Sequence, residues 1–455
     1  MKLTLIASKL FFLLVLALSV QGQGTQGWKA GIAKTVITPE QQMWMGGFAA
    51  RTGPSEGKLH DLWAKAIALE DASGKKALMI TMDLVGIPKA ISDHVRDQIK
   101  TKYGLGREQI ILSTSHTHSG PVLDNALTDI YPLDAEQTEK IRNYSLLLET
   151  KLIKLAGDAF KKMETVGMYS ESGVTRFQVN RRNNPAATLS RVTDLNGPND
   201  YAVPVIKLIN SKGALKAVIF SYACHPVVLD GYQFSGDYVG FAQLELEKSH
   251  PGTQAMFFQG AGADQNPLPR GSVAFAKQYG RELAAAVERV LEDNMKPLDP
   301  KLSMAYSEAE LLLTALPSDA ELSKMATESN VPYYKRWAGR MLENKKRGES
   351  APKNYPYPVQ AWNLGGQPLI ALGGELVVEY GIRIRQLFGI NAFVMGYAND
   401  VMGYIPSATI LREGGYEGAT SQMVYGMPGP WDPAIENTIL TEVKKVADQA
   451  GIKAL

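Results

Sequence analysis

A strand, a helix and a second strand follow one another between residues 76 and 113, and this order constrains the fold of the whole chain. The apolar run 76–83 ends in Asp83, a helical pattern covers 89–103, and residues 109–113 form the second apolar strand. Two strands joined through a helix are expected to be parallel, with a right-handed crossover. Similar patterns recur along the chain without an internal repeat or a long polar linker. They predict one large α/β domain with a mostly parallel or mixed sheet flanked by helices.

The composition excludes some classes of protein. The 455 residues are 45% hydrophobic and 21% charged, as is ordinary for a globular protein with a large core. The net charge is +2 and the charges are interleaved, so the chain lacks the basic stripe of a nucleic-acid-binding protein. Cys224 is the only cysteine, which excludes an intramolecular disulfide.

The N-terminus has the pattern of a secretory signal peptide. Lys2 and Lys9 precede the short apolar run 10–18, and small and polar residues follow up to Gly22. This run is too short for a membrane anchor. We therefore expect residues 1–22 to be removed and residues 23–455 to form a secreted or periplasmic protein.

Two histidines follow the strand at 109–113. His116 and His118 are two residues apart, so in an extended segment their side chains point to the same side. Neutral imidazole is the commonest protein ligand for a transition metal and a usual general base near pH 7. A lone His-x-His pair also occurs on ordinary surfaces, so its interpretation depends on the rest of the chain.

Other predicted strands also end in residues that can carry chemistry. They are His225, the pair Asp264 and Asn266, Glu375, and the segment 399–404. In open α/β sheets the ligand site lies at the carboxyl ends of the strands, so we expect these groups to share one site. Two or three histidines with one carboxylate form a ligand set for catalytic zinc.

Two further stretches have alternative interpretations. The loop that contains Arg181 and Arg182 is either an anion clamp or solvated surface. Residues 302–357 differ in composition and contain a charged, helix-forming run at 319–346. We interpret 302–357 as a helical excursion from the core that either covers the site or decorates the fold.

The order of several short motifs resembles the neutral ceramidases. These motifs are Gly-Ile-Ala at 31–33 with Thr-Pro at 38–39, Ser-His-Thr-His-Ser-Gly-Pro at 115–121, His225-Pro226, Gly374-Glu375, and Gly403-Tyr404 with Tyr-Glu-Gly at 416–418. The resemblance covers most of the expected mature chain, about residues 31–418. Members of this family are secreted or surface zinc amidases that split ceramide into sphingosine and a fatty acid.

The resemblance implies a role for each candidate residue. By motif, the zinc (Zn2+) ligands correspond to His116, His225, Glu375 and Tyr404. The family's residues that contact the reacting group correspond to His118 and Tyr416, and a family arginine to Arg181.

Two departures from the family pattern bear on the substrate rather than on the metal chemistry. Asn266 stands where the family has a serine, in a Gly-Asp-x-Ser-Pro context. An asparagine cannot act as an acyl-accepting nucleophile, although its amide can donate a hydrogen bond to an oxyanion. The family's C-terminal β-sandwich-like domain is not expected either, because the sequence ends at Leu455 soon after the tyrosine motif.

We hypothesise a zinc hydrolase in which metal-bound water attacks an amide carbonyl. In this hypothesis His118 relays the proton, and Tyr416 or Asn266 stabilises the oxyanion. The resemblance implies ceramide or another N-acyl lipid as the substrate. Two alternatives stay open: an amidase, esterase or lactonase for a non-lipid, for example carbohydrate-derived, substrate, and a zinc-binding homologue without catalysis. We expect no nucleic-acid partner and no obligate protein partner, and a peripheral contact with a membrane stays open.

Overall fold

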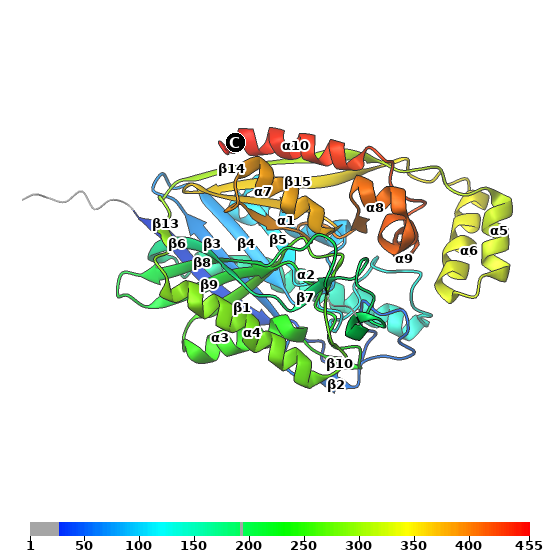
Figure 1. Cartoon of the computed structure of the whole chain (residues 1–455), viewed down its shortest axis with the longest axis horizontal. Coiled ribbons are helices and arrows are strands. Elements are labelled where there is room, and N and C mark those ends of the chain that lie inside the picture. Colours follow the sequence, from blue (N-terminus) through cyan, green and yellow to red (C-terminus); the bar gives the residue numbers. More distant parts are fainter. Residues whose placement is uncertain (1–26, 192–193) are drawn as a thin grey trace, which may run out of the picture.

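Two stacked β-sheets form the frame of the chain (Figure 1). The computed structural model describes residues 27–191 and 194–455, so the signal peptide expected at 1–22 lies outside the described residues. Among the described helices, none has both the length and the apolar character needed to cross a membrane.

The larger sheet contains nine strands and confirms the strand–helix–strand unit. In spatial order its main strands are β11 (Gln254–Gln259), β9 (Leu215–Tyr222), β8 (Ala202–Asn210), β6 (Glu164–Val174), β1 (Trp28–Val36), β3 (Trp63–Glu70), β4 (Lys76–Met82) and β5 (Ile110–Thr114), and the short β13 (Lys296–Pro297) pairs with β6. Helix α1 (Lys89–Tyr103) joins β4 to β5, and these two strands are parallel. The helix ends as predicted because Gly104 adopts a left-handed conformation with φ of 72°.

Parallel pairing is the exception in this sheet. Only β4 with β5 and β9 with β11 are parallel among the described strands of the sheet, and the other neighbours are antiparallel. The mixed sheet is therefore confirmed, whereas the expectation of a mostly parallel one is wrong. Short connections explain the difference: four residues, 211–214, join β8 to β9, and a parallel pair needs a much longer crossover.

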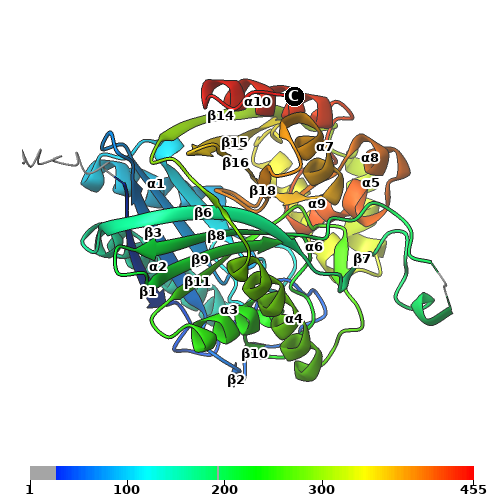
Figure 2. The ribbon, with the colours of Figure 1, turned by 60° about the vertical axis from the view of Figure 1, so that its left-hand side comes forward.

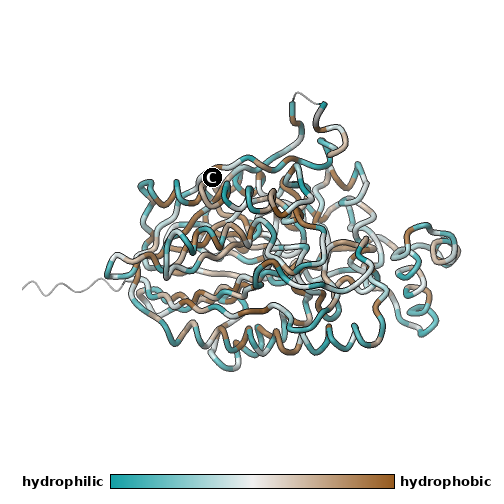
Figure 3. The backbone as a smooth tube through the Cα atoms, turned by 90° about the horizontal axis from the view of Figure 1, so that it is seen from below, coloured by the Kyte–Doolittle hydropathy of each residue, from teal (hydrophilic) through white to brown (hydrophobic). Residues whose placement is uncertain are grey.

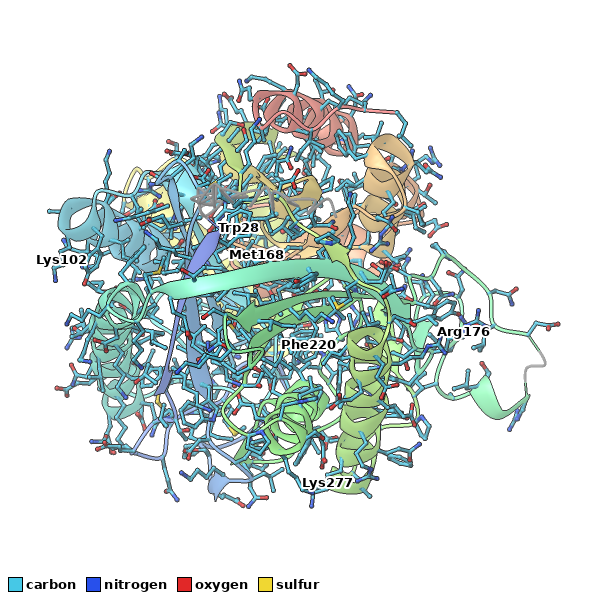
Figure 4. All side chains as sticks on the ribbon, turned by 90° about the vertical axis from the view of Figure 1, so that its left-hand side faces the viewer. Trp28, Lys102, Met168, Arg176, Phe220 and Lys277 are labelled. Atoms are coloured by element: carbon cyan, nitrogen blue, oxygen red, sulfur yellow. The ribbon has the colours of Figure 1, made fainter. Side chains whose placement is uncertain are left out.

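A second sheet packs on one face of the first. Its strands are β14 (Leu302–Leu312), β15 (Asn354–Leu364), β16 (Gln367–Leu372) and β18 (Phe393–Met395). Trp362 and Met395 from this sheet share a buried core with Met168 of β6. In Figure 4, Met168 of β6 lies on the face of the first sheet that is turned toward the second sheet, and Phe220 of β9 lies on the other face.

Helices cover the outer faces of both sheets (Figures 1 and 2). The first sheet packs against α1, α2 (Ala135–Phe160), α3 (Asp237–Ser249) and α4 (Val273–Glu292), and the second against α7 (Val378–Phe388) and α10 (Ile435–Gln449). Figure 3 shows hydrophilic and hydrophobic stretches alternating along the outer helices, which is the pattern of helices with one buried face. The result is a layered arrangement of helices, sheet, sheet and helices.

The segment 302–357 contributes more to the core than its composition indicates. It begins with β14 and ends within β15, and these strands pair along their whole length. Only α5 (Asp319–Glu328) and α6 (Pro332–Lys346) project as the helical hairpin on one side of Figure 1. The strand at 302–312 alternates buried apolar residues with polar ones, so it packs into a sheet despite its charged composition.

The larger sheet coils until its two ends meet. Five antiparallel steps separate β4 from β9, so β9 formally runs opposite to β5. A twist of roughly 20–25° per strand accumulates over these steps and turns the two strands toward a common direction. Gln254 at the start of β11 donates to the carbonyl of Ala66 in β3 at 3.1 Å, across the closed end.

A short segment, 396–399, completes this closure. The Gly396 N–H donates to the carbonyl of Gln259 at the end of β11, at 2.9 Å. Two residues of the same segment bind β5: Asn399 N–H donates to Leu112 O at 2.6 Å, and Tyr397 O accepts from Thr114 N–H at 3.3 Å. The carboxyl ends of β5, β9 and β11 are thereby brought to one place.

Candidate metal centre

Three histidines converge at this place. His116 and His118 follow β5, and His225 follows β9. His116 adopts a left-handed conformation with φ of 63°, which turns the chain sharply after the strand. The potential ligand atoms of the three rings all lie within 4.8 Å of one another. His116 and His225 are buried, so their rings face a site with little solvent.

Backbone carbonyls orient two of the three rings. Nδ1 of His225 donates to the carbonyl of Gly262 at 2.9 Å, and Nδ1 of His116 donates to the carbonyl of Val85. A proton on Nδ1 leaves Nε2 as an unprotonated nitrogen, which is the form that binds a metal. His118 differs, because its buried Nδ1 has no hydrogen-bond partner among the described residues.

Glu375 joins His116 and His225. Its Oε2 lies 3.0 Å from Nε2 of His116 and 3.1 Å from Nε2 of His225, while Oε1 accepts a hydrogen bond from Tyr425. Burial opposes ionisation, but the two histidines hold the pKa of Glu375 well below its ordinary value. The carboxylate is therefore the negative charge of the cluster.

Tyr404 lies beside Glu375 because their strands pair. The two residues are opposite each other in the parallel pair β17 (Glu375–Leu376) and β19 (Tyr404–Ile405). The Tyr404 hydroxyl is 3.4 Å from Nε2 of His225 and accepts a hydrogen bond from Nη2 of Arg181 at 3.1 Å. Burial raises the pKa of Tyr404 well above its ordinary value, and Arg181 opposes this shift.

Three separations among these four groups are close to those of tetrahedral metal ligands. Ligands about 2.0–2.1 Å from a zinc ion are about 3.3–3.4 Å apart. The separations are 3.0 Å from His116 Nε2 to Glu375 Oε2, 3.1 Å from His225 Nε2 to the same oxygen, and 3.4 Å from His225 Nε2 to the Tyr404 hydroxyl. His118 Nε2 is 3.2 Å from His116 Nε2 and so also lies within ligand range. The donor set therefore fits a metal ion, and the free Nδ1 distinguishes His118 from the carbonyl-oriented pair.

The pKa values of His118 and His225 are lowered. Burial, with the neighbouring His116 and His225, holds the pKa of His118 well below its ordinary value. Burial likewise lowers the pKa of His225 to about 4, against the opposing effect of Glu375. Both rings are thus neutral near pH 7, as metal binding and proton acceptance require.

Arg181 connects Tyr404 to Asn266. Its Nη1 donates to Oδ1 of Asn266 at 3.4 Å, and its Nε donates to Glu417 at 2.8 Å. Asn266 lies in β12 (Gln265–Pro267), which pairs with β7 (Gln178–Asn180) immediately before Arg181. Because Oδ1 accepts from the arginine, the Asn266 amide N–H groups are the atoms left to donate elsewhere.

Arg182 is committed to acidic residues and forms no open anion clamp. It binds Glu417 at 2.7 Å and Glu413 at 2.9 Å. Of the two alternatives left open for the arginine pair, the anion clamp does not hold for Arg182. Arg181 faces the site, where its neighbours are Tyr404 and Asn266.

Tyr416 forms the outer edge of the cluster. Its ring centroid is 5.3 Å from that of Tyr404, and its side chain is 40% exposed. Burial of the hydroxyl raises the pKa of Tyr416 well above its ordinary value, so the phenol keeps its proton. The structure thus brings together all eight candidate residues: His116, His118, Arg181, His225, Asn266, Glu375, Tyr404 and Tyr416.

Four further residues at the site were not predicted. The Tyr397 hydroxyl donates to Oε2 of Glu375 at 3.4 Å, and its ring lies 4.4 Å from that of His116. Tyr425 binds Glu375, Glu417 binds Arg181, and the Phe48 ring lies 4.8 Å from that of His118. Glu417 is part of the Tyr-Glu-Gly motif, so its acidic character was a usable signal. Tyr425 and Phe48 lie in stretches without a motif that indicates such contacts.

The fold and this cluster define a mixed α/β protein with a buried site suited to a transition-metal ion. Residues 28–263, more than half of the chain, match the family described as "Neutral/alkaline non-lysosomal ceramidase, N-terminal". The chain belongs to this family, which confirms the resemblance seen in its motifs.

Two solved structures are similar in fold. Neutral ceramidase from Pseudomonas aeruginosa matches with a TM-score of 0.72 and 20% identity, over 94% of this chain and 75% of that one. A ceramidase complexed with C2 matches with a TM-score of 0.70 and 18% identity, over 94% and 76% of the two chains. The likeness shows that the ceramidase fold extends over nearly all of this chain.

Proposed function

We propose that the protein is a zinc-dependent amidase that hydrolyses the amide bond of ceramide or another N-acyl lipid. The observation that carries this proposal is the convergence of His116, His225, Glu375 and Tyr404, whose nitrogen and oxygen atoms approach one another at 3.0–3.4 Å and which are residue types that bind zinc. A bound zinc ion would polarise the carbonyl and lower the pKa of water at the site.

The neighbouring residues supply proton transfer and charge stabilisation. His118 lies 3.2 Å from His116 and takes up the proton released when water attacks the carbonyl; it then returns this proton to the leaving amine. The amide of Asn266 and the hydroxyl of Tyr416 donate hydrogen bonds to the oxygen that becomes negative. Arg181 positions both Tyr404 and Asn266, because it donates a hydrogen bond to each of them.

Asn266 indicates that water, and not a side chain, attacks the substrate. An amide cannot form an acyl-enzyme, so hydrolysis proceeds in one addition to the carbonyl followed by amine release. Family membership and the relative complexed with C2 support a lipid amide. Asn266 also favours a second candidate, an amidase, esterase or lactonase with a non-lipid substrate, because the residue that faces the carbonyl differs from the family's.

The sequence pattern at the N-terminus supports export. We propose that residues 1–22 are a signal peptide and that the mature protein is secreted or periplasmic. N-terminal sequencing of the protein recovered outside the cytoplasm tests this directly, and an intact Met1 there contradicts it.

A substrate screen on zinc-loaded protein tests the function. We expect release of fatty acid from a short-chain fluorescent ceramide, with activity lost on chelation and restored by zinc. Activity on esters or lactones alone would favour the second candidate. Zinc binding without turnover of any amide, ester or lactone would leave a non-catalytic zinc protein.

A further inference from the structure

A cavity of about 350 Å³ lies beside the candidate metal centre. Its walls come from the chain stretches 48–51, 227–232 and 270–271. These stretches lie near β2 (Gly57–Lys58) and β10 (Gln233–Phe234), which pair at the lower edge of Figure 1. The volume is at the lower end of the range for small-molecule pockets and accommodates a polar head group.

Two arginines line this cavity without acidic partners. Arg51 is only 4% exposed, whereas Arg270 is exposed at the rim. Among the described residues, no carboxylate oxygen lies within 4.0 Å of either guanidinium. Asp230 is the acidic residue in the cavity wall, and it is exposed to solvent.

Arg51 is held in place by backbone carbonyl groups. Its Nη1 donates to Gly46 O at 2.8 Å, and its Nε and Nη2 donate to Gly231 O at 3.2 and 3.0 Å. Neutral carbonyls fix the guanidinium but do not neutralise its charge. The acidic group that acts on Arg51 from the cavity wall is the exposed Asp230, and an anionic ligand would further offset the cost of burying the cation.

A single aromatic ring connects the cavity to the candidate catalytic residues. The Arg51 guanidinium lies over Phe48 at 5.1 Å, and the Phe48 ring centroid is 4.8 Å from that of His118. On the other wall, Val227 follows Pro226, whose carbonyl accepts the His118 N–H at 3.3 Å. The cavity therefore lies one aromatic ring away from His118.

We propose that this cavity binds an anionic group of the substrate, so that the enzyme hydrolyses acidic N-acyl compounds faster than neutral ones such as ceramide. Arg270 provides the forked donors that suit a carboxylate, sulfonate or phosphate, and the fixed Arg51 adds a second positive charge in the wall. This inference rests on the proposed amidase function, because it specifies the substrate of the same site.

Three amides with one acyl chain test the proposal: N-octanoylglycine, N-octanoyltaurine and N-octanoylethanolamine. With the zinc-loaded full chain, we expect at least tenfold higher kcat/KM for an anionic amide than for the neutral one. The carboxylate and sulfonate arms show which anion is preferred. Equal kcat/KM for all three would overturn the proposal.

Charge variants provide the matched comparison. Arg270→Gln should lower kcat/KM about tenfold for the anionic amides and change the neutral amide less than twofold. Asp230→Asn should act in the opposite direction on the anionic amides. Arg281→Gln removes an exposed arginine of α4 away from the cavity and should change none of the three. An equal effect of Arg270→Gln on all three amides would contradict the proposal.

Binding measurements separate failure of this inference from failure of the proposed function. If none of the amides is hydrolysed, the amidase function is wrong for these substrates. Calorimetry with N-octanoylglycine and the neutral amide still tests the cavity. Binding of the anionic amide alone, weakened by Arg270→Gln, supports the anion site, and equal or absent binding of the two contradicts it.

Discussion

The hydroxyl of Tyr425 donates a hydrogen bond to Oε1 of Glu375, on the side of the carboxylate that faces away from the histidines. Oε2 is thereby left to face Nε2 of His116 and His225. A hydrogen bond to a ligand carboxylate fixes its orientation and tunes its affinity for the metal.

Tyr425→Phe should weaken zinc binding about 10-fold, because it removes the group that orients Glu375. A competition titration of the metal-free protein against a chromophoric chelator measures this affinity. Tyr144→Phe is the matched control, since the buried Tyr144 hydroxyl binds Ile37 O at 2.6 Å, away from the site. Unchanged zinc affinity in Tyr425→Phe would show that Glu375 does not depend on this hydrogen bond.

His118→Gln should retain about one zinc per chain and lose about 10²- to 10⁴-fold in kcat. The reason is that His118 lacks the carbonyl contact that orients His116 and His225 as ligands. Zinc content by mass spectrometry and turnover of the same sample separate the two roles. His116→Ala is the comparison variant and should lose zinc; loss of zinc from His118→Gln instead would make His118 a ligand.

Asn266→Ala should lower kcat about 10²-fold and leave zinc content unchanged, because it removes a donor aimed at the developing oxyanion. Its contact with Arg181 is long, at 3.4 Å, so the arginine keeps its bonds to Glu417 and Tyr404. Steady-state kinetics with the best amide of the screen provide the measurement. A change confined to KM would assign Asn266 to substrate binding.

Asp400→Asn should change how stability depends on pH. Burial raises the pKa of Asp400 to about 7, while Tyr355 donates to its carboxyl at 2.5 Å and opposes the shift. In the unfolded chain an aspartate has a pKa of about 3.9. Between about pH 4 and pH 7 the unfolded chain has released this proton and the folded chain keeps it, so the free energy of unfolding falls as pH rises.

The asparagine variant lacks this titration. Its free energy of unfolding should therefore rise relative to wild type by about 2–4 kcal/mol between pH 4 and pH 8, since each tenfold change in proton affinity is worth about 1.4 kcal/mol. Urea unfolding of both proteins at pH 4.5, 6 and 8 measures the difference. Parallel pH profiles would mean that Asp400 titrates normally.

Helices and strands whose ends are marked by nearby residues in the sequence were predicted well. Helices α1 and α4 begin and end as expected, because Gly104 closes one and the Ser272 side chain caps the other. The parallel pair of β4 and β5 also follows from adjacent segments. The second sheet was not predicted, because β14 pairs with β15 across the inserted helices 319–346 and no local pattern specifies that pairing.

The residues of the site were predicted from their positions at the ends of strands, and the structure corrects part of that reasoning. The expectation placed its residues at the carboxyl ends of parallel strands, yet β5 and β9 belong to a mostly antiparallel sheet. Their ends meet because the sheet coils and the segment 396–399 closes it. A sequence pattern carries no such long-range information.

The closure by residues 396–399 also sets an order of events in folding. His116 precedes Glu375 and Tyr404 by more than 250 positions, and the bonds from Gly396 and Asn399 join strands formed much earlier in the chain. Contacts at such separation form slowly, because a long loop must close before they contribute stability. A growing polypeptide thus carries an incomplete cluster until Tyr404 has emerged, so a metal ion held by these residues would bind only after that stage of synthesis.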